Sequence, residues 1–133
     1  MQNFSYLTQP GNPQNVHILV VDDDPVILHY LKIMLEKKQY KATFLNSTDE
    51  SVVTSVGPDV ILMDVWLGDA DGKEVCRSIK QNPATSSIPL MMMSSSREAA
   101  KKCIEAGADD FILKPFDIET LLKQITSLVP DAD

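Results

Sequence analysis

Two short apolar runs that end in carboxylates constrain this chain more than any other feature. The stretches Val20–Asp24 and Ile61–Asp64 each pass from apolar side chains directly into aspartate. A strand that is buried on both faces of a parallel sheet needs such a continuous apolar run. Ligands of open α/β folds bind at the carboxyl ends of the strands. If these two strands are neighbours, Asp22, Asp23 and Asp64 converge on one small volume.

A cluster of three carboxylates implies a bound cation, because like charges that lie so close together repel one another. The donors in this cluster are all oxygens, which favour Mg²⁺ or Ca²⁺ over zinc. We therefore expect Asp22, Asp23 and Asp64 to form a divalent metal site, with Mg²⁺ as the cofactor.

The rest of the chain alternates short apolar runs with capped or amphipathic segments. We expect strands at residues 16–21, 40–45, 59–64, 88–93 and 110–113. We expect helices at residues 25–37, 48–56, 71–80, 97–106 and 118–128. Asp24 is a good N-cap for the first helix, and the hydroxyls of Ser94–Ser96 are expected to cap the fourth. This alternation predicts the α/β class, a five-stranded parallel sheet that is doubly wound with five helices.

The length and the charge limit what such a domain can do. The 133 residues suit one domain, which we place at residues 16–129 between a flexible extension at 1–15 and a tail at 130–133. The net charge of −7 argues against binding to nucleic acid or to an anionic membrane surface. No secretory signal or membrane-spanning run is apparent, and Cys76 and Cys103 lack metal-site spacing. We therefore expect a cytoplasmic protein.

Two more polar side chains follow strands of the predicted sheet, Ser94 after the fourth and Lys114 after the fifth. Lys114 and one Mg²⁺ would bring the charge of the three carboxylates close to zero. A phosphoryl group on one aspartate would then find a partner for each of its three oxygens: the metal, the Lys114 ammonium and the Ser94 hydroxyl. Because a carboxylate is an adequate nucleophile for phosphoryl transfer, the set predicts a phosphoryl-accepting site.

Taken in chain order, these motifs resemble those of the response-regulator receiver domain, which has the flavodoxin-like, CheY-like fold. The motifs are Asp22-Asp23 after the first strand, Asp64 with Asp71-Gly72 after the third, Ser94 after the fourth and Lys114-Pro115-Phe116 after the fifth. The resemblance covers residues 16–129.

The resemblance implies a role for each acidic residue. Asp64 would be the phosphoacceptor. Asp23 would bind Mg²⁺ directly, and Asp22 would bind it more through water. The backbone carbonyl of Trp66 would be a further metal ligand.

The resemblance also implies a switch that involves Ser94, Lys114 and Phe111. Ser94 would be the switch hydroxyl and Lys114 the lysine that binds the phosphoryl group. Phe111 would rotate inward as Ser94 moves toward the phosphoryl group, which would bias the surface formed by residues 97–128 between two arrangements.

Such a domain is a signalling module whose only catalysis is its own phosphoryl transfer and dephosphorylation. A histidine kinase or a histidine phosphotransfer protein would supply the phosphoryl group, and the surface at residues 97–128 would control an output protein or domain. Thr120 and Gln124 stand where the winged-helix transcription-factor branch of the family has charged residues. We therefore expect a monomer rather than the dimer of that branch.

Two positions depart from the usual pattern of the family. Gly68 stands where proline is usual, which leaves that loop freer. Trp66 is bulky for its place. Trp66 and Ser96 would flank the line along which water attacks the phosphoryl group, so they are expected to set its lifetime.

Two other functions are consistent with parts of the sequence. Asp22-x-Asp24 after an apolar strand is similar to the opening motif of haloacid-dehalogenase-type phosphatases, in which Asp22 would be the nucleophile. That interpretation leaves Asp64 unexplained and places Asp109-Asp110 before its strand rather than after it. An interaction module that works without phosphorylation is the second alternative.

A calcium-binding EF-hand loop at residues 67–78 is excluded, because Leu67 and Ser78 would occupy its first and twelfth ligand positions.

Overall fold

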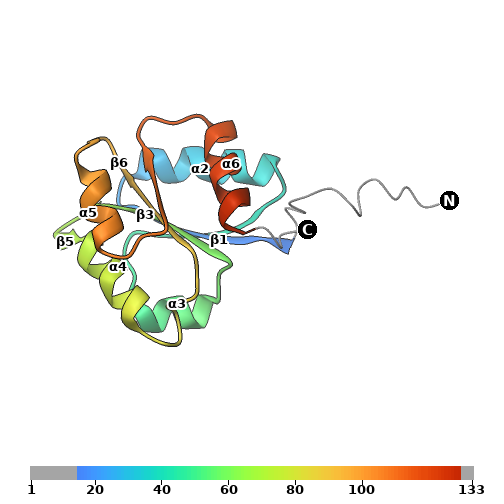
Figure 1. Ribbon diagram of the computed structural model, residues 1–133. Helices are drawn as coiled ribbons and strands as arrows, with labels where there is room; N and C mark the ends of the chain where they lie inside the picture. The colour runs from blue at the N-terminus through green and yellow to red at the C-terminus, as the bar shows by residue number, and fades with distance from the viewer. Residues whose placement is uncertain (1–14, 130–133) are drawn as a thin grey trace.

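The sheet confirms the predicted fold class. The computed structural model describes residues 15–129, so the predicted extension at 1–15 lies almost wholly outside the described residues and the tail at 130–133 lies entirely outside them. Five parallel strands form one sheet in the order β2-β1-β3-β6-β7 (Figure 1). The strands are β1 His17–Val21, β2 Lys41–Leu45, β3 Val60–Asp64, β6 Leu90–Ser94 and β7 Asp110–Leu113. This order places β1 beside β3, as the convergence of their acidic ends requires.

Within residues 15–129, five helices cover both faces of the sheet. They are α2 Pro25–Lys37, α3 Glu50–Val56, α4 Gly72–Gln81, α5 Ala99–Glu105 and α6 Ile118–Leu128. One core places the buried side chains of α2 and α6 against one face, and a second core places those of α3, α4 and α5 against the other. None of the helices in the described part of the chain is both long enough and apolar enough to cross a membrane.

The two cores explain why the strands are apolar without interruption. Ile18, Val20 and Leu62 belong to the core under α2 and α6, whereas Leu19 and Ile61 belong to the core under α3, α4 and α5. Successive side chains of a strand point to opposite faces, and both faces are buried here. A polar residue is therefore tolerated only where a strand ends.

Aspartates begin most of the helices. Asp24, Asp49, Asp71 and Asp117 each accept a hydrogen bond from a backbone N–H of the first turn that follows. The predicted cap of the fourth helix is wrong. Helix α5 begins at Ala99 after Glu98, which makes no side-chain cap bond. The Ser94 hydroxyl instead accepts a hydrogen bond from the backbone N–H of Ser96, because Ser94 is still the last residue of β6.

A small hairpin replaces the loop that the sequence predicts between β3 and α4. Its strands are β4 Trp66–Leu67 and β5 Ala70–Asp71, which pair antiparallel. Gly68 turns the chain with a φ of 62°, a value that favours glycine. Gly72 is required where the hairpin meets α4, because a Cβ there would overlap the carbonyl oxygen of Asp64. The hairpin is therefore held directly against the end of β3.

We expect Leu31→Ala to lower the free energy of unfolding by about 2–5 kcal/mol, because the Leu31 side chain is fully buried in the core under α2 and α6. Ile33→Ala on the same helix is the matched control. Ile33 is 44% exposed, so its loss should be below about 1 kcal/mol. Urea unfolding measures both values, and equal losses would contradict the assignment of the buried face of α2.

Candidate functional site

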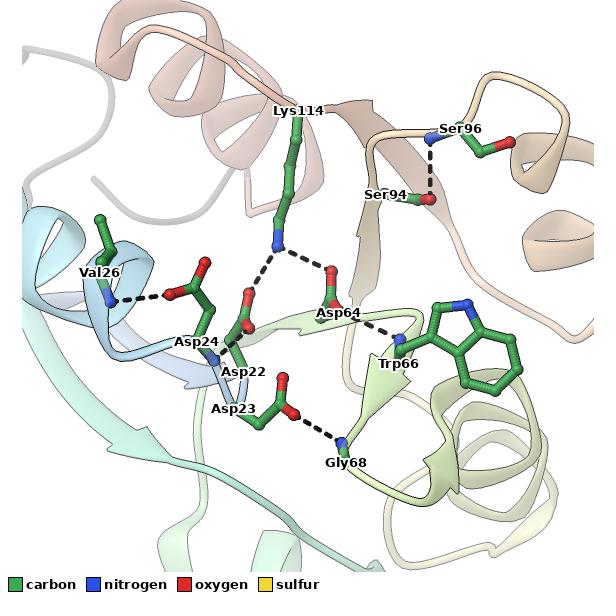
Figure 2. Close-up of polar contacts among 10 residues, drawn as sticks. All are labelled: Asp22, Asp23, Asp24, Val26, Asp64, Trp66, Gly68, Ser94, Ser96 and Lys114. Atoms are coloured by element: carbon green, nitrogen blue, oxygen red, sulfur yellow. Dashed lines mark hydrogen bonds and ion pairs between the residues drawn. The ribbon is translucent and has the colours of Figure 1, made fainter.

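Three carboxylates meet at the carboxyl edge of the sheet (Figure 2). Asp22 and Asp23 follow β1, and Asp64 is the last residue of β3. Each of the three offers an oxygen that lies within 4.8 Å of the others. The structure therefore brings together the acidic residues that the sequence predicts to converge, because β1 and β3 are adjacent and in parallel register up to Val21 and Met63.

Lys114 lies between two of these carboxylates. Its Nζ donates to Asp22 Oδ2 at 2.8 Å and lies 2.9 Å from Asp64 Oδ1. Lys114 directly follows β7, and its backbone N–H donates to the carbonyl of Ser94 at 2.8 Å. The lysine side chain thus reaches from the edge strand β7 over the end of β6 to the acidic cluster.

Burial sets the electrostatics of this pair. Burial of the Asp22 carboxyl raises its pKa; the Lys114 ammonium and the N–H of Asp24 oppose that rise, and the nearby charge of Asp64 adds to it. Asp22 therefore takes up a proton at a higher pH than an exposed aspartate, and protonation in that range favours the folded state. Burial lowers the pKa of Lys114, but its hydrogen bonds to Asp22 and Asp64 outweigh that effect and leave the pKa raised. Lys114 is therefore a cation at neutral pH.

The hairpin β4–β5 supplies backbone donors to the other acidic oxygens. The N–H of Gly68 donates to Asp23 Oδ2 at 2.8 Å, and the N–H of Trp66 donates to Asp64 Oδ2 at 3.2 Å. The hairpin thus connects the end of β1 with the end of β3. No pattern in the sequence predicts this role, although Asp71-Gly72 marks the place where the hairpin closes against Asp64.

The donor set fits a hard divalent cation. All of its side-chain donors are carboxylate oxygens, which suit Mg²⁺. Three carboxylates face one ammonium, so two negative charges stay uncompensated when all the groups are ionised. Asp22 already uses both of its oxygens, Oδ1 toward the N–H of Asp24 and Oδ2 toward Lys114. Asp23 is exposed and is the more accessible donor.

The predicted switch residues lie on the strands beside the cluster. Ser94 ends β6 and is only 8% exposed. Phe111 in β7 is half-buried and packs against the core under α3, α4 and α5. The carbonyl of Phe111 accepts a hydrogen bond at 3.0 Å from the Gln124 side chain of α6, a contact that the sequence does not reveal.

The arrangement expected of a phosphatase with Asp22 as nucleophile is not formed. The Asp24 side chain accepts from the N–H of Val26 and serves as a helix cap. Asp109 lies at the amino end of β7, where it pairs with Lys80 at 2.9 Å. Because the strands are parallel, the amino end of β7 and the carboxyl end of β1, where Asp22 lies, are at opposite ends of the strands.

Comparisons with known proteins agree with this geometry. The sequence pattern of the family described as "Response regulator receiver domain" matches residues 18–126. The chain is 31% identical over 120 residues to the DNA-binding dual master transcriptional regulator RpaA of Synechocystis sp., covering 87% of this chain and 50% of that protein. It is 34% identical over 116 residues to the transcriptional regulatory protein ResD of Bacillus subtilis, covering 84% of this chain and 47% of that protein.

A solved structure shows the same fold in a different protein context. The signal receiver domain of a signal transduction histidine kinase from Syntrophus aciditrophicus superimposes with a TM-score of 0.72 at 30% identity, covering 86% of this chain and 89% of that one. The chain spans about half the length of the two curated relatives named above. The similarity to those relatives therefore concerns this domain and not the activity of the complete relatives.

We expect Mg²⁺ to change the fluorescence of Trp66, the only tryptophan, because the backbone N–H of Trp66 donates to the Asp64 carboxylate. Asp23→Asn should abolish the change, since it removes the most accessible carboxylate charge of the cluster. Asp24→Asn is the matched control, because Asp24 caps α2 outside the cluster and asparagine is also a good cap. A titration that is the same in Asp23→Asn and wild type would contradict this metal site.

Proposed function

This chain belongs to the response regulator receiver domain family, and from that premise we propose that it is a switch that accepts a phosphoryl group on Asp64. The donor is a phosphohistidine of a sensor kinase or of a histidine phosphotransfer protein. The observation that carries the proposal is the position of the Lys114 ammonium, 2.8 Å from Asp22 and 2.9 Å from Asp64. A family member of this kind is a signalling module rather than an enzyme that turns over a separate substrate.

Access and contacts favour Asp64 over its neighbours as the phosphoacceptor. The Asp22 side chain is 1% exposed, and both of its oxygens are engaged. Asp23 is exposed, but its side chain accepts a hydrogen bond from the N–H of Gly68 and contacts no cation within the described residues. Asp64 combines a contact to Lys114 with a side chain that is 14% exposed. It is therefore the carboxylate that a phosphodonor reaches and that a protein cation already supports.

The acidic residues would hold Mg²⁺ in the manner that the family resemblance implies. Asp23, Asp64 and the backbone carbonyl of Trp66 would be direct ligands. Asp22 would act more through water, in agreement with the engagement of both its oxygens by the N–H of Asp24 and by Lys114. When bound, Mg²⁺ supplies positive charge against the negative oxygens of the phosphoryl group.

The protein side chains receive the group once it has been transferred. A carboxylate oxygen of Asp64 forms the new bond to phosphorus, and the bond from phosphorus to the histidine nitrogen breaks. Lys114 then moves its hydrogen bond from Asp64 to a phosphoryl oxygen, which carries more negative charge. The Ser94 hydroxyl accepts from Ser96 and still has its own proton to donate. It turns that proton toward a second phosphoryl oxygen.

When Ser94 moves, β7 and the helices beside it change their positions. Ser94 and Leu113 are paired in the sheet, and Phe111 lies two residues before Leu113. Phe111 rotates inward as Ser94 moves, which shifts the surface formed by α5, β7 and α6 between two arrangements. The bond between Gln124 and the Phe111 carbonyl connects this movement to α6. An output protein or domain binds this surface, and the domain itself works as a monomer.

We expect Asp64→Asn to abolish labelling by acetyl phosphate in the presence of Mg²⁺, because the amide cannot form an acyl phosphate. Intact-mass spectrometry detects the phosphoryl adduct on the wild type. Asp24→Asn should still be labelled, since Asp24 lies outside the cluster. An adduct that persists on Asp64→Asn, or that maps to Asp22, would refute the assignment.

We expect Lys114→Ala to keep part of the labelling but to lose most of the conformational response. The nucleophile is still present, whereas the cation that holds the phosphoryl group is not. Hydrogen exchange of α5, β7 and α6 with and without phosphodonor measures the response. Lys123→Ala, an exposed site on α6, is the control that should respond like the wild type. A full response in Lys114→Ala would contradict this role.

A further inference from the structure

A groove with an uncharged lining lies at the rim of the core under α2 and α6. Its volume is about 330 Å³, and it is lined by Val26, Ile27, Tyr30, Pro115 and Phe116. The first three belong to the start of α2, and the other two lie between β7 and α6. Ile27, Tyr30 and Phe116 are half-buried against the core, whereas Val26 is 74% exposed. A contiguous apolar surface that is open to solvent is typical of a contact site.

The segment that precedes β1 has a composition that suits this groove. Residues 1–15 contain no charged side chain, although the chain as a whole has a net charge of −7. Phe4 and Tyr6 are two positions apart, so in an extended stretch both rings point to the same side. Aromatic rings pack favourably against one another, and the groove offers the rings of Tyr30 and Phe116.

The groove is within reach of this segment. Val16 directly precedes β1 and belongs to the core under α2 and α6, which the groove borders. The five residues of β1 rise by about 17 Å toward the edge of the sheet where α2 begins. Residues 7–15 lie between Tyr6 and Val16, and a stretch of that length spans up to about 30 Å when extended. The segment is therefore longer than the sheet that it has to pass.

We propose that residues 4–7 dock in this groove, with the rings of Phe4 and Tyr6 against those of Tyr30 and Phe116. Residues 4–7 lie outside the described part of the chain, and the rest of the extension would be the tether to β1. The inference does not depend on the proposed function, because it concerns an apolar contact within the chain.

Two other occupants fit the groove less well. Residues 130–133 contain two aspartates and no aromatic ring, so they lack the side chains that an uncharged groove would bury. A second copy of the chain brings the same net charge of −7, which opposes the association of two copies.

A segment docked here would lie beside the acidic site. Pro115 directly follows Lys114, and the Lys114 ammonium lies 2.9 Å from the Asp64 carboxylate. Phe116 follows Pro115 in the same connection between β7 and α6. The docked segment would therefore cover the connection that carries Lys114 and shield its apolar side chains from water.

Methyl NMR spectra of the intact chain test the contact, because an aromatic ring shifts the resonances of the methyl groups that it touches. We expect Phe4→Ser/Tyr6→Ser to shift the methyl resonances of Val26 and Ile27. The methyl resonances of Ile33 should stay in place, since Ile33 lies on the same helix but outside the lining of the groove.

The matched control is Gln2→Ser/Gln9→Ser, which changes two uncharged residues that flank residues 4–7 and should shift none of these resonances. A covalent probe then locates the contact. Benzoylphenylalanine in place of Phe4 should, on irradiation, cross-link within one chain to a residue that lines the groove. Val26→Asp places a charge in the groove and should abolish this cross-link. Because Val26 is mostly exposed, Val26→Asp should stay folded, which its urea unfolding midpoint verifies.

Several outcomes would overturn the proposal. These are unshifted Val26 and Ile27 resonances in Phe4→Ser/Tyr6→Ser, equal shifts in the control variant, and the absence of a cross-link to the groove. A cross-linked dimer would assign the groove to a second copy and would also overturn it. Labelling of Asp64 by acetyl phosphate should persist in Phe4→Ser/Tyr6→Ser, so failure of this contact would leave the phosphoacceptor assignment intact.

Discussion

The ammonium of Lys114 lies between two carboxylates that belong to different strands, and the arrangement of the site depends on this contact. Asp22 follows β1, Asp64 ends β3, and Lys114 follows β7, which lies two strands away from β3. A buried carboxylate without a partner costs several kcal/mol, on the order of the whole stability of a small domain. Lys114 offsets part of that cost for Asp22. The same contact fixes Lys114 where a phosphoryl group on Asp64 would need a cation.

The hairpin β4–β5 gives the site its second support. Backbone N–H groups of Trp66 and Gly68 donate to Asp64 and Asp23, so the acidic oxygens are held from the hairpin as well as from the strands. The requirement for glycine at position 72 allows the hairpin to close against the Asp64 carbonyl. Lys114 and the hairpin together leave one side of Asp64 accessible, and a cleft lined by Trp66, Ser94 and Ser96 opens on that side. Access to the carboxylate is thus a consequence of how it is supported.

The sequence predicts the sheet and the acidic cluster well for physical reasons. Strands such as β3 are buried on both faces, so they are apolar up to their last residue and their polar ends are conspicuous. Asp24 and Asp71 are strong local signals for helix starts, and both act as caps. The contact of Lys114 with Asp64 follows once the parallel order of the strands is known, because the carboxyl ends of all five strands lie on the same side of the sheet.

The features that the sequence does not predict depend on tertiary contacts. Two-residue strands such as Trp66–Leu67 are too short for an alternating pattern to appear. The run Ser94–Ser96 has the composition of a helix cap, but β6 extends to Ser94 and α5 starts later, so the hydroxyls are not placed to cap it. The bond from Gln124 to the Phe111 carbonyl joins residues that only the packing of α6 against β7 brings together.

We propose that the carboxylates at the ends of β1 and β3, supported by Lys114, form one divalent metal site around the phosphoacceptor. The most direct measurement is a crystal structure of the protein soaked with Mn²⁺, which occupies the same kind of oxygen site as Mg²⁺ and is located by its anomalous scattering. We expect one strong anomalous peak within direct coordination distance, about 2.0–2.4 Å, of carboxylate oxygens of both Asp23 and Asp64. A peak elsewhere with none at these residues, or Asp64 turned away from Asp23 and Lys114, would contradict it.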